Sequence, residues 1–280
     1  MEVLLAPKAG FCFGVRMAIE KTEEHLAAAT EPSYRIEAPV HNERVTRALE
    51  ERGLRAATSV ADIPEGTYII SAHGAAPEVY HEAEQRGLKL LDTTCPIVTS
   101  LQRKAKRLQD DGYQVIILGE RAHAEIMGVL GHLNYDADVI SGPEEAHTVP
   151  IRKSKVALVS QTTHAVPAFE QATVILRERA EAFEAVNTVC WTVDERVEAA
   201  LEFAPSVEAM VVVGSRTSSN TLKLADQLQA AFPQQPCHLV TGPEELNPPD
   251  FAGLHRVGVT AGASTPDWVI EAVMERLQGF

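Results

Sequence analysis

The stretch Leu88–Val98 leads from a short apolar run into a helical pattern and places a cysteine on the turn between the two. Pro96 follows Cys95, and a proline at the first position of a helix sacrifices no hydrogen bond. We therefore expect Cys95 at a helix start, where unpaired backbone N–H groups and the helix dipole stabilise a thiolate. Such a cysteine is suited to bind a metal or to act as a nucleophile.

The same order of apolar run, cysteine and helical pattern occurs at two other places. Cys12 precedes the pattern that begins at Gly14, and Cys190 precedes the pattern Asp194–Leu201. The repetition predicts three similar α/β lobes that each contribute one thiolate, although free cysteines also pack in protein cores without any chemistry. Cys237 has no helical pattern behind it, and we interpret it as a core residue.

Short apolar runs alternate with helical patterns along the whole chain, which predicts an α/β fold with mostly parallel sheets. Two of the predicted helices span residues 126–133 and 168–185. The predicted lobes comprise residues 14–95, residues 96–190, and residues 191–280 together with residues 1–13.

Most of the conspicuous polar residues directly follow an apolar run, at the expected carboxyl ends of strands. This group comprises His41, His73, His123 with Glu125, Gln161–His164, Ser218–Asn220 and Ala263–Thr265. In parallel sheets ligands bind at this edge, beside helix N-termini that attract anions. The two serine-containing segments thus predict small phosphate-binding loops, and ordinary helix capping is their simpler alternative. His123 and Glu125 are two residues apart, a spacing that suits a shared ligand on a loop.

The composition argues against several classes of protein. The formal net charge is −14, and the one basic cluster, Arg103–Arg107, is interpreted as a solvated helix face, so nucleic acid is not an expected partner. No apolar run approaches the roughly 18 residues of a membrane span. Four cysteines do not make a disulfide framework, and the chain begins with a predicted strand rather than a leader. We therefore expect a cytoplasmic protein.

Eight short motifs, taken together in their order, resemble one family. They are Gly10–Val15, Val40–Asn42, Ser71–Gly74, Asp92–Pro96, His123–Glu125, Gln161–Thr163, Ser218–Asn220 and Ala261–Asp267. The family is IspH (LytB), the 4-hydroxy-3-methylbut-2-enyl diphosphate reductases, and the resemblance spans nearly the whole chain.

The resemblance implies a three-lobed α/β trefoil around a 4Fe–4S cluster with an open fourth iron, held by cysteines that match Cys12, Cys95 and Cys190. It implies that the diphosphate is bound by side chains matching His41, His73, His123, Ser218, Ser219, Asn220 and Ser264, and that protons are delivered by those matching Glu125 and Thr162. The implied reaction removes the allylic hydroxyl with two electrons and two protons and gives isopentenyl and dimethylallyl diphosphates. An external donor such as ferredoxin or flavodoxin supplies the electrons.

The residue chemistry agrees with these implied roles. Histidine, hydroxyl and amide groups can hold a diphosphate without fixed arginines. A carboxylate that is shielded beside a polyanion has a raised pKa and can donate a proton. This is the role expected for Glu125.

The chain departs from the family pattern after the third cysteine. Where the family has Cys-x-Ala-Thr-x-x-Arg-Gln, Trp191 follows the ligand, Val193 and Val197 replace hydrogen-bonding residues, and Arg196 is retained. Ala124 also replaces the usual proline between His and Glu. These changes predict altered surroundings for the cluster.

Three alternatives to the reductase remain open at this point. The first is a paralogue with the same cluster that acts on another allylic or phosphorylated substrate. The second is a cluster-bearing sensor without turnover. The third is a hydrolase in which the three histidines and Glu125 hold zinc while the cysteines are structural.

Overall fold

The computed structural model describes residues 1–280, and every strand in it belongs to one of three four-stranded sheets. All strand pairs are parallel, and the spatial orders are β1-β12-β10-β11, β3-β2-β4-β5 and β7-β6-β8-β9. The strands are Glu2–Leu5 (β1), Ser33–Arg35 (β2), Leu54–Ala56 (β3), Thr67–Ile70 (β4), Lys89–Asp92 (β5), Gln114–Leu118 (β6), Asp138–Ile140 (β7), Lys155–Ser160 (β8), Ala182–Ala185 (β9), Ala209–Val213 (β10), Cys237–Val240 (β11) and Arg256–Ala261 (β12). The predicted α/β fold with three parallel-sheet lobes is confirmed.

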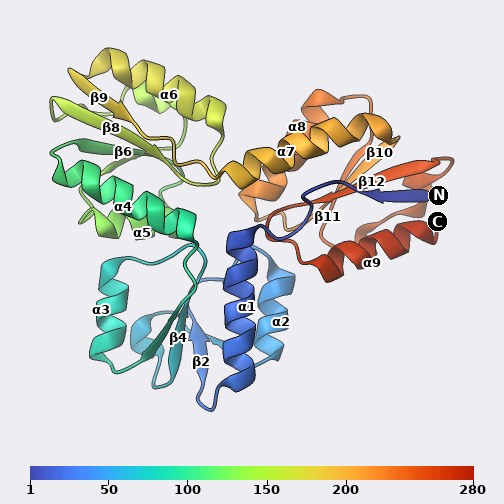
Figure 1. Ribbon diagram of the computed structural model, residues 1–280, viewed down its shortest axis with the longest axis horizontal. Coiled ribbons are helices and arrows are strands. Elements are labelled where there is room, and N and C mark those ends of the chain that lie inside the picture. The colour runs from blue at the N-terminus through green and yellow to red at the C-terminus, as the bar shows by residue number, and fades with distance from the viewer. The chain divides into compact units, whose positions relative to one another are not determined.

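Nine α-helices connect these strands, and most are labelled in Figure 1. They are Phe13–Ala28 (α1), Glu43–Glu51 (α2), Pro77–Gln85 (α3), Pro96–Asp110 (α4), Ala124–His132 (α5), Val166–Arg179 (α6), Trp191–Phe203 (α7), Ser219–Ala231 (α8) and Asp267–Gln278 (α9). Short 3-10 helices span Val60–Asp62, Pro143–His147, Ala204–Ser206, Pro243–Glu245 and Pro248–Phe251. None of the helices is long and apolar enough to cross a membrane.

The chain divides into two units. The first unit comprises Met1–Arg16, Val40–Leu49 and Trp191–Phe280 and contains the sheet β1-β12-β10-β11. The second unit comprises Met17–Pro39 and Glu50–Cys190 and contains the other two sheets. The boundaries expected for the three lobes, after residues 95 and 190, stay predictions.

The sheet of the first unit is covered on both faces, because successive strand residues point in opposite directions. Val211 and Val213 of β10 pack with α9, whereas Met210 and Val212 pack with α7 and α8. Figure 1 shows the same arrangement, with α9 on one side of β10 and β12 and α7 with α8 on the other. This burial on both faces explains the continuous apolar run of β10.

The sheet β7-β6-β8-β9 of the second unit follows the same rule. Val115 and Ile117 of β6 pack against α4 and α5, whereas Ile116 and Leu118 pack against α6. In the sheet β3-β2-β4-β5, Tyr68 and Ile70 of β4 belong to an apolar cluster with residues of α3. In all three sheets the strands end at loops that carry candidate site residues.

Two helix starts have the form that the sequence predicts. Cys95 is the residue that caps α4, with an extended backbone, and Pro96 is the first helical residue. Asn42 caps α2 through Oδ1, which accepts hydrogen bonds from the backbone N–H groups of Arg44 at 3.1 Å and Val45 at 3.3 Å. These caps fix the turns that carry Cys95 and His41.

Two predicted helix boundaries are wrong. The helix expected over residues 168–185 ends at Arg179, and Ala182–Ala185 forms the strand β9, which pairs with β8. The sequence of this segment has high helix propensity, but pairing with β8 and packing of Phe183 against the core override it. The helix expected over residues 126–133 begins already at Ala124, so Glu125 lies in a helical first turn rather than on a loop.

Candidate active site

Each of the three candidate cysteines stands directly before the first residue of a helix, α1, α4 or α7. None of the three is in a disulfide, and all three are partly exposed. Each also donates its backbone N–H to a carbonyl of a strand-end loop, from Cys12 to Ala263 at 3.1 Å, from Cys95 to Ala72 at 3.0 Å, and from Cys190 to Thr162 at 2.7 Å. Ala263 precedes Ser264, Ala72 precedes His73, and Thr162 is itself a predicted proton-delivering residue. Every cysteine turn is therefore attached to a loop that carries a residue predicted to bind substrate or to deliver protons.

Glu125 is the most deeply buried acidic residue of the site, with 1% of its surface exposed. Its Oε2 accepts a hydrogen bond from the Thr162 hydroxyl at 2.6 Å, and its Oε1 accepts one from the Thr162 backbone N–H at 2.7 Å. Burial raises the pKa of Glu125, and the two hydrogen bonds from Thr162 act in the opposite direction without cancelling it. The carboxyl group is therefore able to hold a proton and to exchange it through the Thr162 hydroxyl.

His123 and His73 lie beside this carboxyl group in the second unit. His123 caps α5, and its Nδ1 accepts a hydrogen bond from the backbone N–H of Glu125 at 3.2 Å. The rings of His73 and His123 meet edge to face, with their centroids 5.4 Å apart. Hydrogen bonds and a ring contact thus connect Cys95, through the loop of His73, to His123, Glu125 and Thr162.

A glycine is required on the turn that carries His73. Gly74 has a φ of +74°, and an added Cβ would lie 2.8 Å from Nε2 of Gln102 and 3.0 Å from Cγ2 of Thr94. Both the left-handed backbone and the close approach of α4 favour glycine at this position. The turn therefore holds His73 in a fixed place next to the Cys95 loop.

The first unit brings together a second group of predicted residues. The Ser264 hydroxyl donates a hydrogen bond to the carbonyl of His41 at 3.2 Å and lies 3.4 Å from the Ser218 hydroxyl. Ser218 also caps α8, since its Oγ accepts from the backbone N–H of Thr221. The helix-capping interpretation of this serine is thus correct, and its hydroxyl remains beside that of Ser264.

Ser219 and Asn220 form the first two residues of α8, directly behind Ser218. Oδ1 of Asn220 is buried without a hydrogen-bond partner. A buried amide oxygen without a partner is uncommon in native proteins. The amide oxygen of Asn220 is therefore available as an acceptor at this helix N-terminus.

Arg196 links the Cys12 turn to α7 in the first unit. Its Nη2 donates to the carbonyl of Gly10 at 2.8 Å and its Nη1 to the carbonyl of Thr192 at 3.0 Å. The side chain is buried, with 6% of the residue exposed. The sequence singles out Arg196 only as a retained family position, and its contact with Gly10 has no signal in the sequence.

After Cys190, α7 buries two valines and exposes one aromatic side chain. Val193 and Val197 are buried, and Val197 belongs to the core cluster between α7, α8 and the sheet. Trp191 is 57% exposed, and its ring stacks on that of Phe13 with centroids 6.2 Å apart. Val197 is therefore a packing residue of the sheet core, and Trp191 with Phe13 forms an aromatic pair on the surface.

The comparisons with known proteins agree with these features. The sequence profile of the family described as LytB protein matches residues 3–278. The chain belongs to the LytB protein family. Among curated LytB relatives, the 4-hydroxy-3-methylbut-2-enyl diphosphate reductase of Geobacter metallireducens is 34% identical over 278 residues, covering 99% of this chain and 97% of the relative. The enzyme of the same name from Anaeromyxobacter sp. (strain Fw109-5) is 38% identical over 281 residues, covering 100% and 98%.

Solved structures of the same kind match the fold. A structure of (E)-4-hydroxy-3-methyl-but-2-enyl diphosphate reductase, described as the terminal enzyme of the non-mevalonate pathway, is 32% identical, covers 100% of both chains and has a TM-score of 0.79. The reductase from Plasmodium falciparum is 26% identical, covers 96% of this chain and 86% of its own, and has a TM-score of 0.87. These matches confirm, over nearly the whole of this chain, the family resemblance that the sequence motifs indicate.

Proposed function

We propose that this chain is a 4-hydroxy-3-methylbut-2-enyl diphosphate reductase, which removes the allylic hydroxyl as water with two electrons and two protons and yields isopentenyl and dimethylallyl diphosphates. Family membership over residues 3–278 and the activities named for the relatives support the reaction. The observation that carries the proposal is the buried Glu125–Thr162 pair. The carbonyl of Thr162 accepts a hydrogen bond from the backbone N–H of Cys190, a candidate cluster ligand. This arrangement offers a proton donor next to a thiolate.

The residues that would hold a 4Fe–4S cluster are Cys12, Cys95 and Cys190. Their chemistry fits, because three thiols at helix starts, none of them in a disulfide, offer the soft, ionisable ligands that iron–sulfur clusters take. A cluster held there would pass electrons one at a time from an external donor and would have one iron without a cysteine ligand. The fourth thiol does not fit this role, since burial raises the pKa of Cys237 to about 11.

The diphosphate would be bound by the residues that the family resemblance implies, which are His41, His73, His123, Ser218, Ser219, Asn220 and Ser264. Ser218 caps α8, and its hydroxyl lies 3.4 Å from that of Ser264. The rings of His73 and His123 contact each other. Hydroxyl and amide donors at a helix N-terminus are suited to phosphate oxygens, and imidazole can donate in its neutral or its charged form.

Protons would pass from Glu125 to the substrate through Thr162. When Glu125 is protonated, its O–H can donate to Oγ1 of Thr162, and the hydroxyl hydrogen of Thr162 is then free to turn toward the leaving hydroxyl. One proton leaves with that hydroxyl as water, and the second is added to carbon. The raised pKa keeps a proton on Glu125 at pH values where an exposed carboxyl would have lost it.

The electrons would come from an external donor, either a ferredoxin or a flavodoxin. We propose the cytoplasm as the location, because cysteines that bind a cluster as thiolates need a reducing compartment.

Anaerobic reconstitution with iron and sulfide, followed by a visible spectrum, iron and zinc analysis and turnover with reduced methyl viologen, tests the proposal. We expect a brown protein that oxidises the dye only when the hydroxymethylbutenyl diphosphate is present. A colourless zinc protein would favour the hydrolase, and a brown protein without turnover would favour the sensor. Turnover of another allylic substrate alone would favour the paralogue.

A further inference from the structure

The first turn of α2 contacts the loop that follows strand β10 in the first unit. The Ser215 hydroxyl donates to Oε2 of Glu43 at 2.8 Å, and the Thr217 hydroxyl donates to Oε1 of Glu43 at 3.0 Å. The backbone N–H of Thr217 also donates to Oγ of Ser215 at 3.1 Å. Both carboxylate oxygens of Glu43 are thus engaged by one short loop, which leads directly into Ser218.

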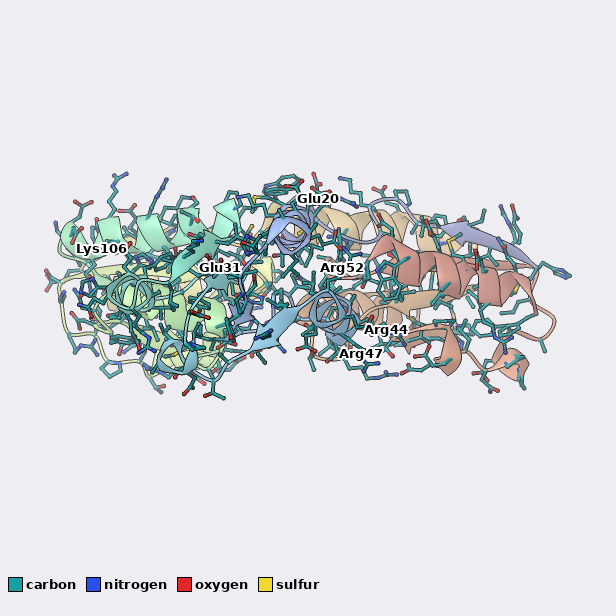
Figure 2. All side chains as sticks on the ribbon, turned by 90° about the horizontal axis from the view of Figure 1, so that it is seen from below. Glu20, Glu31, Arg44, Arg47, Arg52 and Lys106 are labelled. Atoms are coloured by element: carbon teal, nitrogen blue, oxygen red, sulfur yellow. The ribbon has the colours of Figure 1, made fainter.

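The next residue of α2 contacts the loop that follows the neighbouring strand β11. Nε of Arg44 donates to the carbonyl of Thr241 at 2.8 Å, and its guanidinium pairs with Glu244. An added Cβ at Gly242 would overlap the Arg44 guanidinium, so a larger residue there would displace this side chain. Figure 2 labels Arg44 on α2 together with Arg47, one helical turn further on.

We infer that Glu43 is a positioning residue. It holds the turn that carries His41 next to the loop that leads into Ser218, so that these two parts of the proposed phosphate site in the first unit face the same ligand. His41 lies two residues before Glu43, and Ser218 directly follows Thr217. The Ser264 hydroxyl, which lies beside that of Ser218 and donates to the His41 carbonyl, closes a ring of contacts from Glu43 in α2 to His41 in the turn before it. The inference rests on the proposed diphosphate substrate.

Glu43 also decides which hydroxyls of the loop can serve a ligand. The hydroxyls of Ser215 and Thr217 donate to Glu43 and are therefore not available to phosphate oxygens. Burial acts to raise the pKa of Glu43, but hydrogen bonds from its own backbone N–H, Ser215 and Thr217 outweigh it and hold the pKa below its usual value. The group stays an acceptor at neutral pH, and Ser218 is left as the hydroxyl donor of this loop.

Two substitutions at this position separate hydrogen bonding from charge. Glu43→Ala removes both acceptor oxygens. Glu43→Gln keeps one acceptor oxygen, adds an amide NH2 group that can donate to the hydroxyl of Ser215 or Thr217, and removes the charge. Arg47→Ala is the matched control, because Arg47 is an exposed residue of the same helix. Neither Glu43 nor Arg47 belongs to the core, so the three variants are expected to fold.

The test is the affinity of the reconstituted full chain for inorganic pyrophosphate, measured by titration calorimetry. We expect Glu43→Ala to weaken the affinity about tenfold, which is about 1.4 kcal/mol, and Glu43→Gln and Arg47→Ala to stay within about threefold of the parent. Equal affinity in Glu43→Ala and the parent would overturn the inference. A loss in Glu43→Gln as large as that in Glu43→Ala would also overturn it, because charge and not position would then be the cause.

Amide hydrogen exchange separates this inference from the proposed function. If the parent itself binds no pyrophosphate, the diphosphate substrate is contradicted, and the positioning role is decided by exchange alone. We expect Glu43→Ala to speed exchange in the peptides that contain residues 40–42 and 214–218, and Glu43→Gln to restore the slow rate. Unchanged exchange in Glu43→Ala would show that Glu43 does not hold the two segments.

Discussion

The hydroxyl of Thr162 donates a 2.6 Å hydrogen bond to Oε2 of Glu125, a carboxyl group that is almost completely buried. The two residues are 37 positions apart in the sequence. They meet because Glu125, in the first turn of α5 after β6, and Thr162, in the loop after the adjacent strand β8, lie at the same edge of one sheet. This pair is the proton-delivering part of the proposed mechanism.

Replacing the carboxyl group by an amide should abolish proton delivery. We expect Glu125→Gln to lower the turnover rate by about a hundredfold or more, because the amide occupies the same space without an acidic proton. The visible spectrum and pyrophosphate affinity should not change. Glu120→Gln, an exposed change in the loop before α5, is the matched control and should retain the full rate. A parent-like rate in Glu125→Gln would remove Glu125 from the mechanism.

The raised pKa of Glu125 also makes stability depend on pH. Between the ordinary glutamate pKa and the raised folded pKa, the folded protein keeps a proton that the unfolded chain has lost. The contribution of Glu125 to the free energy of unfolding is therefore largest at low pH and falls as the pH rises through this window. Glu125→Gln lacks this loss, so its Tm relative to the parent should increase as the pH rises above the ordinary glutamate pKa of about 4.3. A constant Tm difference would contradict the shift.

The four cysteines should behave in two classes. Cys12→Ser, Cys95→Ser and Cys190→Ser should each prevent formation of the brown chromophore, because each removes one of three thiolate ligands. Cys237→Ser should keep the colour and the iron content. In the parent, the thiol of Cys237 should react slowly with iodoacetamide at neutral pH and faster as the pH approaches its pKa of about 11. Full colour in Cys95→Ser would contradict the ligand set.

The valine at position 197 should be needed for packing. We expect Val197→Gln to lower the free energy of unfolding by about 2 kcal/mol, because a buried amide would lack hydrogen-bond partners in the cluster with Ala200 and Leu224. Thermal unfolding measures the change, and Val174→Gln on the exposed face of α6 serves as the control. A Val197→Gln variant with parent stability and a higher turnover rate would instead show that position 197 faces the cluster.

The sequence predicts features that neighbouring residues determine. Pro96 after Cys95 and Asn42 before α2 are local signals, and both helix starts lie where these residues indicate. The strand β9 could not be predicted in the same way, because its Ala-rich segment becomes a strand only by pairing with β8.

Contacts between distant parts of the chain account for the other features that the sequence does not predict. The burial of Glu125 depends on Thr162, and the contact of Glu43 with Ser215 joins residues 172 positions apart. A single sequence contains no signal for such pairs. The motifs therefore identify candidate residues, whereas the partners of those residues and the resulting pKa shifts come from the fold.

The most direct test is the ratio of dye oxidised to diphosphate consumed by the reconstituted protein. Methyl viologen carries one electron, and the proposed reaction takes up two, so we expect two reduced dye molecules to disappear for each hydroxymethylbutenyl diphosphate, with isopentenyl and dimethylallyl diphosphates as products. If the protein with its full iron content leaves the diphosphate unchanged, or releases phosphate from it without oxidising the dye, the reductase assignment is contradicted.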